Sequence, residues 1–166
     1  MADKEGNILA KNYGFERPAE QKSFYVKGAE HLDWGMKDRL ARIFSPKSGR
    51  TVMLAFDHGY IMGPTAGLER LDLAIPPLAE YADVLMATRG AIRACVPPTY
   101  GKAIALRCTS DTSVLHKDLS LGCAAVNAED AIRLNASCMV VQNFVGSQNE
   151  VGSFKNLNET INEGMR

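Results

Sequence analysis

The sequence has no apolar stretch long enough to cross a membrane. Its longest apolar segments, such as residues 136–145, are much shorter than the roughly 20 residues that a spanning helix needs. The first residues stay polar through Gln21 and contain no apolar core of a secretory signal. We therefore expect a cytoplasmic protein that does not enter a membrane.

Net charge is also absent. Nineteen Lys and Arg residues balance nineteen Asp and Glu residues in a chain of 166. A surface that follows nucleic-acid phosphates normally has a basic excess or a basic run, and the densest basic segment here, 37–42, includes Asp38. The composition therefore argues against a nucleic-acid partner. With 46% apolar residues it also argues against a disordered chain.

Cysteines with metal-ligand spacing are missing. The chain has no Cys-x-x-Cys motif, and it is not a small, cysteine-dense scaffold of the kind that disulfides stabilise. We expect free thiols, no metal site and no bound cofactor. The four cysteines are Cys95, Cys108, Cys123 and Cys138.

The chain opens with a polar segment, 1–31, that we interpret as an N-terminal arm. Apolar residues then recur at helical spacing from Trp34 to Phe44 and predict a short amphipathic helix, which Pro46 ends. We expect Trp34 to anchor this helix by packing. Residues 45–50 form a turn that leads into a different pattern.

That pattern is strand, loop and helix, repeated. Four apolar runs are continuous rather than alternating, as in strands buried on both faces of a parallel sheet, and small or polar residues follow each one. Helical patterns lie between and after them, at 68–78, at 127–135 with Asn127 as N-cap, and at 153–164 with Ser153 as N-cap. Strands that alternate with helices predict right-handed crossovers. The four runs are 51–56, 82–87, 103–108 and 138–145.

The spacing of these units favours a barrel. A (β/α)8 TIM barrel takes about 250 residues, or about 31 per unit, so the chain from Thr51 onward holds just under four units. We predict an α/β fold in which residues 32–166 form half of such a barrel. Because 164–166 resemble a helix end with no strand after it, we expect a truncated chain. An open sheet of flavodoxin type is less favoured, since Asp57-His-Gly-Tyr is not a glycine-rich phosphate loop.

Several motifs resemble one enzyme family, the 3-hydroxy-5-phosphonooxypentane-2,4-dione thiolases, also described as autoinducer-2 aldolases. These belong with the archaeal-type class I fructose-bisphosphate aldolases, which are (β/α)8 barrels. The resemblance is strong from Leu32 onward and corresponds to the N-terminal part of the family chain. Its motifs are Leu32-Asp-Trp-Gly-Met, Arg39-Leu-x-Arg-Ile-Phe-x-Pro-Lys, Thr51-Val-Met-Leu-Ala-Phe-Asp-His-Gly-Tyr, Gly63-Pro-Thr-x-Gly-Leu-Glu-Arg, Ala82-Asp-Val-Leu-Met-x-Thr-Arg-Gly and Val96-Pro-Pro.

The resemblance implies transfer of an acetyl group from the phosphorylated dione to coenzyme A, as the last step of autoinducer-2 degradation. Coenzyme A is then a co-substrate, and the partner is a phosphorylated small molecule. The family works through a lysine Schiff base on the sixth strand, which this sequence does not contain. Lys102 begins the third run, at the end opposite to a barrel's active site, and Lys117 lies in a loop. Neither one is a convincing substitute.

Asp57 is the candidate catalytic residue. It follows the first strand, where a carboxylate can transfer a proton or orient a substrate hydroxyl, and the matching aspartate lines the site in the related aldolases. The alternative is an aspartate that caps the following turn. His58, Thr88 and Arg89 are candidate substrate-binding residues. For His58 the alternative is packing away from the site, and for Arg89 it is a structural salt bridge.

Phe144 departs from the pattern of the related enzymes. They place an acid–base tyrosine at the end of the fourth strand, where this sequence has Asn143-Phe-Val-Gly-Ser. We expect Phe144 to form an apolar wall of the substrate site, with Gln142 and Ser147 as weaker candidates for polar contacts.

Three functions remain open. The favoured one is a fragment of the thiolase described above, and a fructose-bisphosphate aldolase-like lyase is the runner-up. The other is an inactive half-barrel that acts only through association with a partner or a second copy. In each case the unpaired sheet edges predict a homo-oligomer.

Overall fold

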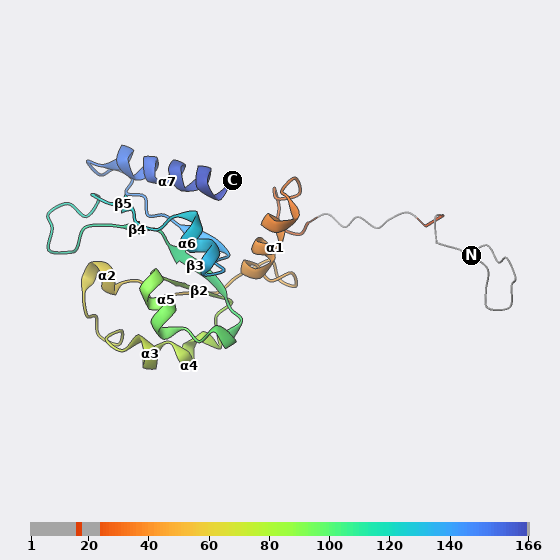
Figure 1. Ribbon diagram of the computed structural model, residues 1–166, viewed down its shortest axis with the longest axis horizontal. Coiled ribbons are helices and arrows are strands. Elements are labelled where there is room, and N and C mark those ends of the chain that lie inside the picture. Colours follow the sequence, from red (N-terminus) through yellow and green to blue (C-terminus); the bar gives the residue numbers. More distant parts are fainter. Residues whose placement is uncertain (1–15, 18–23, 166) are drawn as a thin grey trace, which may run out of the picture.

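The computed structural model describes residues 16–17 and 24–165. Most of the arm expected over 1–31 lies outside this part of the chain, and its role stays a prediction. The described chain contains helix α1 (Trp34–Ile43) followed by an α/β unit with two sheets (Figure 1). In this described part, no helix is long and apolar enough to cross a membrane.

The main sheet has four parallel strands in the order β1-β2-β3-β6, as the sequence pattern predicts. The strands are β1 (Met53–Ala55), β2 (Val84–Ala87), β3 (Ala103–Arg107) and β6 (Cys138–Val140). A second sheet, which the sequence analysis did not predict, pairs β4 (Thr109–Ser110) with β5 (Cys123–Ala124) in antiparallel fashion.

Side chains alternate between the two faces of the main sheet. On one face, Phe56 and Leu85 pack with Ile75 and Ile92 from the helical segments that follow β1 and β2, Ile75 lying between two short helices. These helices are α2 (Gly59–Met62), α3 (Leu71–Ala74), α4 (Pro76–Ala79) and α5 (Arg89–Cys95). Farther along the same face, Leu106 packs with Ala131 of α6 (Ala128–Arg133).

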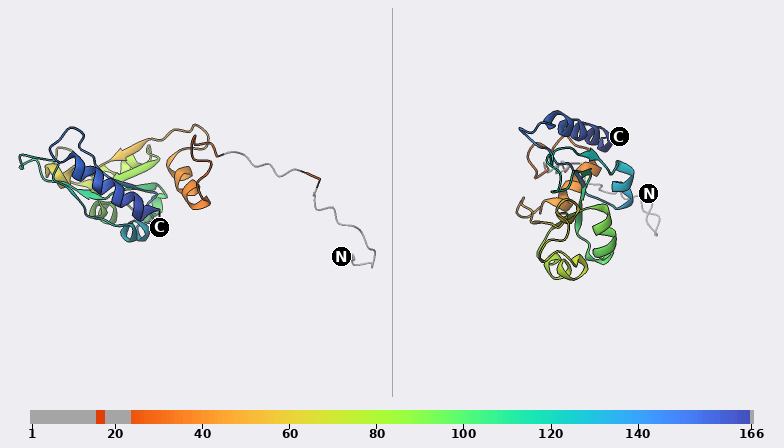
Figure 2. Two further views of the ribbon diagram at one scale, coloured as in Figure 1. Left: turned by 90° about the horizontal axis from the view of Figure 1, so that it is seen from above. Right: turned by 90° about the vertical axis from the view of Figure 1, so that its left-hand side faces the viewer.

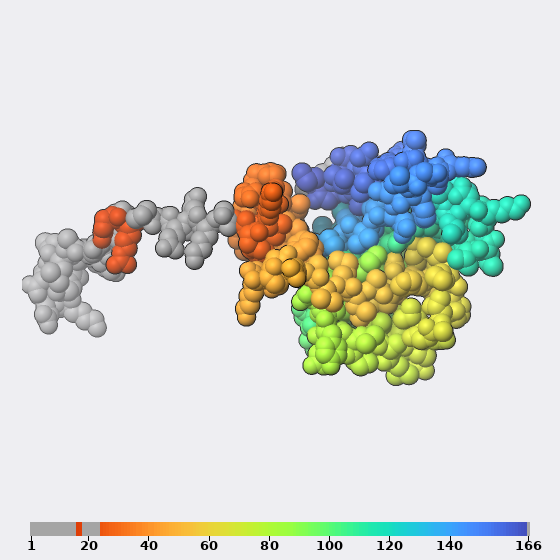
Figure 3. Space-filling model, turned by 180° about the vertical axis from the view of Figure 1, so that it is seen from behind, coloured from red at the N-terminus to blue at the C-terminus, as the bar shows by residue number. Residues whose placement is uncertain are grey.

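The other face of the sheet corresponds to the interior of a barrel. Ile43 of α1 covers it at the amino ends of the strands, where it packs with Val84 and Ala103. The last helix, α7 (Glu150–Gly164), lies beside α6 and the β4–β5 hairpin (Figure 2). A groove of about 460 Å³ lies between α1, α6, β6 and α7, at the junction of the orange and blue parts in Figure 3. The arrangement is that of a partial barrel.

Several local predictions were wrong, each for a physical reason. The first strand is not buried on both faces, because it is a sheet edge with an open inner side, and Val52 and Met53 are 58% and 40% exposed. The helix expected over 68–78 is two short helices, α3 and α4, which adjoin at Pro76. Trp34 does not anchor α1 by packing, since it is 80% exposed.

The segment expected as the fourth strand, 138–145, forms a strand only over its first three residues. After Val140 the chain leaves the sheet and reaches α7, whose N-cap is Asn149 rather than Ser153. Ser153 lies inside the helix and is 2% exposed. The prediction for Asn127 is confirmed, since its side chain caps α6 by accepting a hydrogen bond from Asp130 N at 3.0 Å.

Candidate functional site

The candidate site lies at the carboxyl ends of the parallel strands. Asp57 follows β1 by two residues, and Arg107 is the last residue of β3. Both belong to the alternation that faces the barrel interior, because Phe56 and Leu106 point to the helical face. Active sites of (β/α)8 barrels lie at this end of the strands. The strand registers therefore bring an aspartate and an arginine together at the expected edge.

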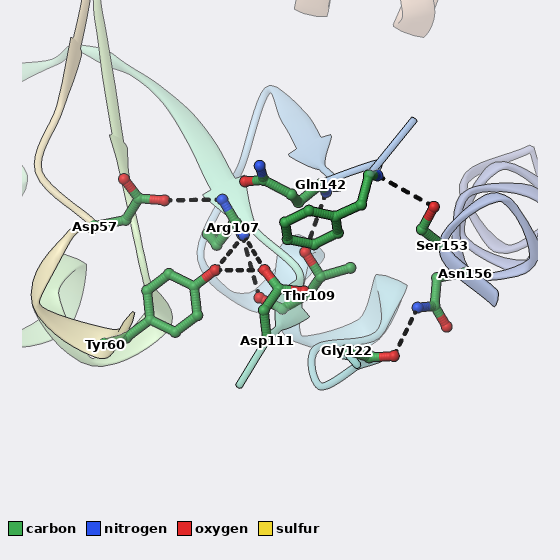
Figure 4. A network of polar contacts seen from close by, with 10 residues as sticks. Asp57, Tyr60, Arg107, Thr109, Asp111, Gly122, Gln142, Ser153 and Asn156 are labelled. Atoms are coloured by element: carbon green, nitrogen blue, oxygen red, sulfur yellow. Dashed lines mark hydrogen bonds and ion pairs between the residues drawn. The ribbon is translucent and has the colours of Figure 1, made fainter. Parts of the chain in front are cut away.

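Arg107 is the centre of the site. Its Nη1 lies 3.2 Å from Asp57 Oδ2, its Nη2 lies 2.5 Å from Asp111 Oδ2, and its Nε donates to Thr109 O at 3.2 Å (Figure 4). The side chains of Arg107, Asp57 and Asp111 are 5%, 9% and 2% exposed. Buried charges are tolerated only when they are paired and hydrogen-bonded, and here one guanidinium serves two carboxylates.

Tyr60 of α2 completes this group, which we call the Arg107 cluster (Asp57, Tyr60, Arg107 and Asp111). Its hydroxyl donates to Asp111 Oδ2 at 2.7 Å and accepts a hydrogen bond from Arg107 Nη2. The guanidinium also lies over the tyrosine ring, 4.9 Å from its centroid. Burial, and then the hydrogen bond to Asp111, raise the pKa of Tyr60 far above its usual value. The phenol therefore stays protonated at neutral pH.

The geometry of the cluster suits Asp57 to hold a substrate group. Its Oδ2 is fixed by Arg107, whereas its Oδ1 accepts no hydrogen bond from the described residues. A carboxylate held in this way can accept a hydrogen bond or a proton from a hydroxyl group that enters the site. The role of Asp57 as a turn cap receives no support from its side-chain contacts, which go to Arg107 on another strand.

The structure places the other predicted residues around this edge without joining them to the cluster. His58 is exposed and directly precedes α2. Thr88 caps α5, where its Oγ1 accepts a hydrogen bond from Ala91 N at 3.3 Å. Arg89 forms an ion pair with Asp130 of α6 at 2.6 Å. The contacts of Thr88 and Arg89 are therefore structural, and binding of substrate by these residues and by His58 remains a prediction.

Phe144 lies in the irregular segment after β6 and is half-buried. Its backbone N–H donates to Ser153 Oγ at 3.3 Å, and its carbonyl accepts from Ser147 Oγ at 2.8 Å. Gln142 is linked to the Arg107 cluster through Thr109. Its backbone N–H donates to Thr109 Oγ1 at 3.1 Å, and Thr109 O accepts from Arg107 Nε. The end of β6 is thus fixed beside the end of β3, and an apolar wall at Phe144 remains a prediction.

Sequence reasoning missed three members of the cluster. Only Arg107 carried a signal, because a charged residue within a buried apolar run needs a buried partner of opposite charge. Tyr60 lies in the short helix α2 and Asp111 directly follows β4, in segments that the sequence pattern did not predict. This position, at the start of the connection to β5, places Asp111 four residues from Arg107 in the chain.

Lysines and metal ligands do not converge on the cluster in the described part of the chain. Lys102 Nζ donates to Ala82 O at 2.8 Å, at the amino ends of the strands and away from the site. Lys117 is exposed, and Lys155 of α7 faces Glu159. The described residues form no group of three or more His, Cys, Asp or Glu side chains that could hold a metal ion.

A parallel sheet with helices on its outer face and a polar cluster at its carboxyl edge is the arrangement of a partial (β/α)8 barrel. An archaeal fructose-1,6-bisphosphate aldolase whose catalytic lysine carries the carbinolamine intermediate superposes with a TM-score of 0.62 and 21% identity. The match covers 78% of this chain and 53% of that one. Another crystal structure of an archaeal fructose 1,6-bisphosphate aldolase matches with 22% identity and the same TM-score. These likenesses confirm the predicted fold.

Comparison with curated proteins gives the more specific result. The chain is 50% identical over all 166 residues to the 3-hydroxy-5-phosphonooxypentane-2,4-dione thiolase of Yersinia pseudotuberculosis and 49% identical to that of Yersinia pestis. It is 51% identical to an uncharacterized aldolase of Pasteurella multocida. The chain spans 57% of the length of each relative. No protein-family model matches it. The resemblance noted from the motifs is therefore confirmed over the whole chain.

Proposed function

We propose that this chain forms the substrate-holding part of a thiolase that transfers an acetyl group from 3-hydroxy-5-phosphonooxypentane-2,4-dione to coenzyme A. The observation that carries the proposal is the 50% identity over all 166 residues to a protein of that name. The buried Asp57–Arg107 pair supports it, because it lies where barrel enzymes place their chemistry.

The proposed reaction balances without a redox partner. The thiol of coenzyme A adds to the acetyl carbonyl, the bond between C2 and C3 breaks, and C3 takes up the proton that the thiol gives. The products are acetyl-CoA and dihydroxyacetone phosphate. A protonated imine at C4 would accept the electron pair of the breaking bond. None of Lys102, Lys117 and Lys155 contacts the Arg107 cluster, so we assign imine formation to a lysine in the additional length of the relatives.

Within this scheme, Asp57 contacts the substrate. Its Oδ1 would accept a hydrogen bond from the C3 hydroxyl and so fix the position of C3 in the site. Arg107 keeps the carboxylate in place through the 3.2 Å contact. Phe144 would exclude water from the bond that breaks.

A second candidate is aldol cleavage of a phosphorylated sugar, favoured by the 51% identity to a protein named as an aldolase. Aldol cleavage needs a general acid or base beside the bond that breaks, and Phe144 has no ionisable group. The two reactions differ in one requirement, since only acetyl transfer consumes coenzyme A.

The test measures product binding and turnover separately. The 166-residue chain is titrated with dihydroxyacetone phosphate while amide NMR signals near Asp57 are followed. For turnover, a chimera in which these 166 residues replace the matching part of the Yersinia pseudotuberculosis thiolase is assayed for acetyl-CoA with the dione and coenzyme A. We expect saturable shifts at Asp57 and weaker binding by at least about tenfold in Asp57→Asn, because the hydroxyl acceptor loses its charge. Asp72→Asn is the matched control, since Asp72 pairs with Arg70 on the surface. Unchanged affinity in Asp57→Asn would exclude the assigned role.

A further inference from the structure

The charges of the Arg107 cluster do not cancel. Arg107 contributes one positive charge, and its ion-pair partners Asp57 and Asp111 contribute two negative charges, so the sum is −1. Tyr60 stays neutral, because burial and Asp111 raise its pKa. An arginine at a barrel mouth is the usual partner of an anionic substrate group. Here the second carboxylate makes the cluster negative, so we expect it to repel an anionic group rather than bind one.

Arg107 has also used nearly all of its donors. A guanidinium offers five N–H groups. Nε donates to Thr109 O, Nη1 donates to Asp57 Oδ2, and Nη2 donates to both Asp111 Oδ2 and the Tyr60 hydroxyl. By this count a single N–H group, on Nη1, is left without a partner. One remaining donor can serve a single carbonyl or hydroxyl oxygen, whereas a phosphate needs several donors.

We propose that Asp111 is a specificity residue that keeps phosphate away from Arg107, so that the uncharged hydroxyketone end of the substrate faces the Arg107 cluster. This inference rests on the function proposed above and adds the orientation of the substrate. The phosphorylated end then points away from Asp57, across the open inner side of the sheet. The side chain of Asp111 is 2% exposed, so water screens its charge weakly and its effect on a nearby anion is strong.

The experiment uses inorganic phosphate as the probe and needs no turnover. The chain and its variants are titrated with phosphate, and the Nε–Hε signal of Arg107 is followed by NMR. We expect this signal to stay unchanged in the wild-type chain. In Asp111→Asn the cluster becomes neutral and Arg107 gains free donors, so its signal should shift and saturate with an affinity at least about tenfold higher, equivalent to about 1.4 kcal/mol.

Three further variants serve as controls. Asp72→Asn frees Arg70, a surface arginine, in the same way, and should leave the Arg107 signal unresponsive. Asp57→Asn also brings the cluster to neutrality and should admit phosphate, which provides a second test if Asp111→Asn does not fold. Tyr60→Phe changes no charge and should still exclude phosphate.

The outcomes show whether phosphate is excluded by the charge of Asp111 or by side chains that block access to Arg107. If the wild-type chain binds phosphate at Arg107 as tightly as Asp111→Asn, the proposal is wrong. It is equally wrong if Tyr60→Phe admits phosphate to the same degree, because removal of a hydroxyl would then suffice. Failure of the acetyl-transfer assay would leave the phosphate titration unaffected, so the specificity of Asp111 and the proposed reaction are tested separately.

Discussion

Arg107 Nη1 lies 3.2 Å from Asp57 Oδ2, and this buried ion pair joins the carboxyl ends of β1 and β3 across the intervening β2. Asp111 occupies the other side of the guanidinium at 2.5 Å. The pair therefore belongs both to the candidate site and to the structure that holds the sheet edge together.

Removal of the arginine should destabilise the fold. Arg107→Met leaves two buried carboxylates without a partner, and loss of one member of a buried ion pair typically costs about 3–5 kcal/mol. Urea unfolding followed by circular dichroism measures the change. Arg70→Met, which breaks an exposed pair with Asp72, should leave the transition midpoint unchanged. Equal midpoints for the two variants would show that the Arg107 cluster does not stabilise the sheet.

Tyr60 should make stability depend on alkaline pH. Its pKa in the folded chain is raised, first by burial and then by Asp111, so above about pH 10 the unfolded chain loses the phenolic proton first. The contribution of Tyr60 is therefore complete below pH 10 and is lost as pH rises further. Urea midpoints between pH 8 and 11 should fall more steeply for wild type than for Tyr60→Phe. Tyr81→Phe, at a tyrosine that is 77% exposed, should retain the wild-type slope.

Ser153 should matter more than an ordinary helix serine. Its Oγ accepts a hydrogen bond from the Phe144 N–H and donates to Glu150 O at 2.7 Å, and the residue is buried. In Ser153→Ala the Phe144 N–H loses its acceptor, which should lower the free energy of unfolding by about 1–2 kcal/mol. Ser110→Ala, at an exposed position in β4, is the control. Equal stability of both variants would show that Ser153 does not fix the segment at Phe144.

The 166-residue chain should form no specific imine with dihydroxyacetone phosphate. Imine formation needs an amine held in a desolvated pocket, whereas Lys102 is bound to Ala82 O and Lys117 is exposed. Treatment with borohydride followed by mass measurement of peptides tests this expectation. Trapping at one lysine in stoichiometric yield would show that the chain supplies its own nucleophile.

We also predict self-association through the free sheet edges. β1 and β6 are the outer strands of the four-stranded sheet, and Val52 and Met53 are exposed at the first of them. Sedimentation velocity should show association that increases with concentration. Met53→Lys should reduce it, whereas Leu73→Lys, at an exposed position on α3, should not. A monomer at tens of micromolar would contradict the prediction.

The order of strands and helices was predictable because the apolar runs are continuous and well separated. The four predicted strands form the parallel sheet, and Asn127 caps its helix as the pattern indicates. Strand lengths and edge exposure were not predictable, because they depend on how many neighbours a strand has. Residues 141–145 include apolar Val141, Phe144 and Val145, yet the chain leaves the sheet there.

The candidate site was only partly predictable. Asp57 stood out because it follows a strand, and its position at the carboxyl edge could be inferred from strand polarity. Asp111 and Tyr60 could not be inferred, because their contacts with Arg107 depend on how the loops fold back. In the sequence, Asp111 looks like any turn residue, because hydrophobic periodicity does not indicate where a side chain between two elements points.

The contacts of Arg107 span very different distances along the chain. Asp111 is four residues from Arg107, whereas Asp57 is 50 residues away, so the second contact closes a much longer loop. We expect Arg107 and Asp111 to meet early in folding, and Asp57 to join only when β1 has docked against β2. The Asp57 carboxylate, which we propose to hold the substrate, would then be placed last, and a partly folded chain would expose an arginine paired with a single aspartate.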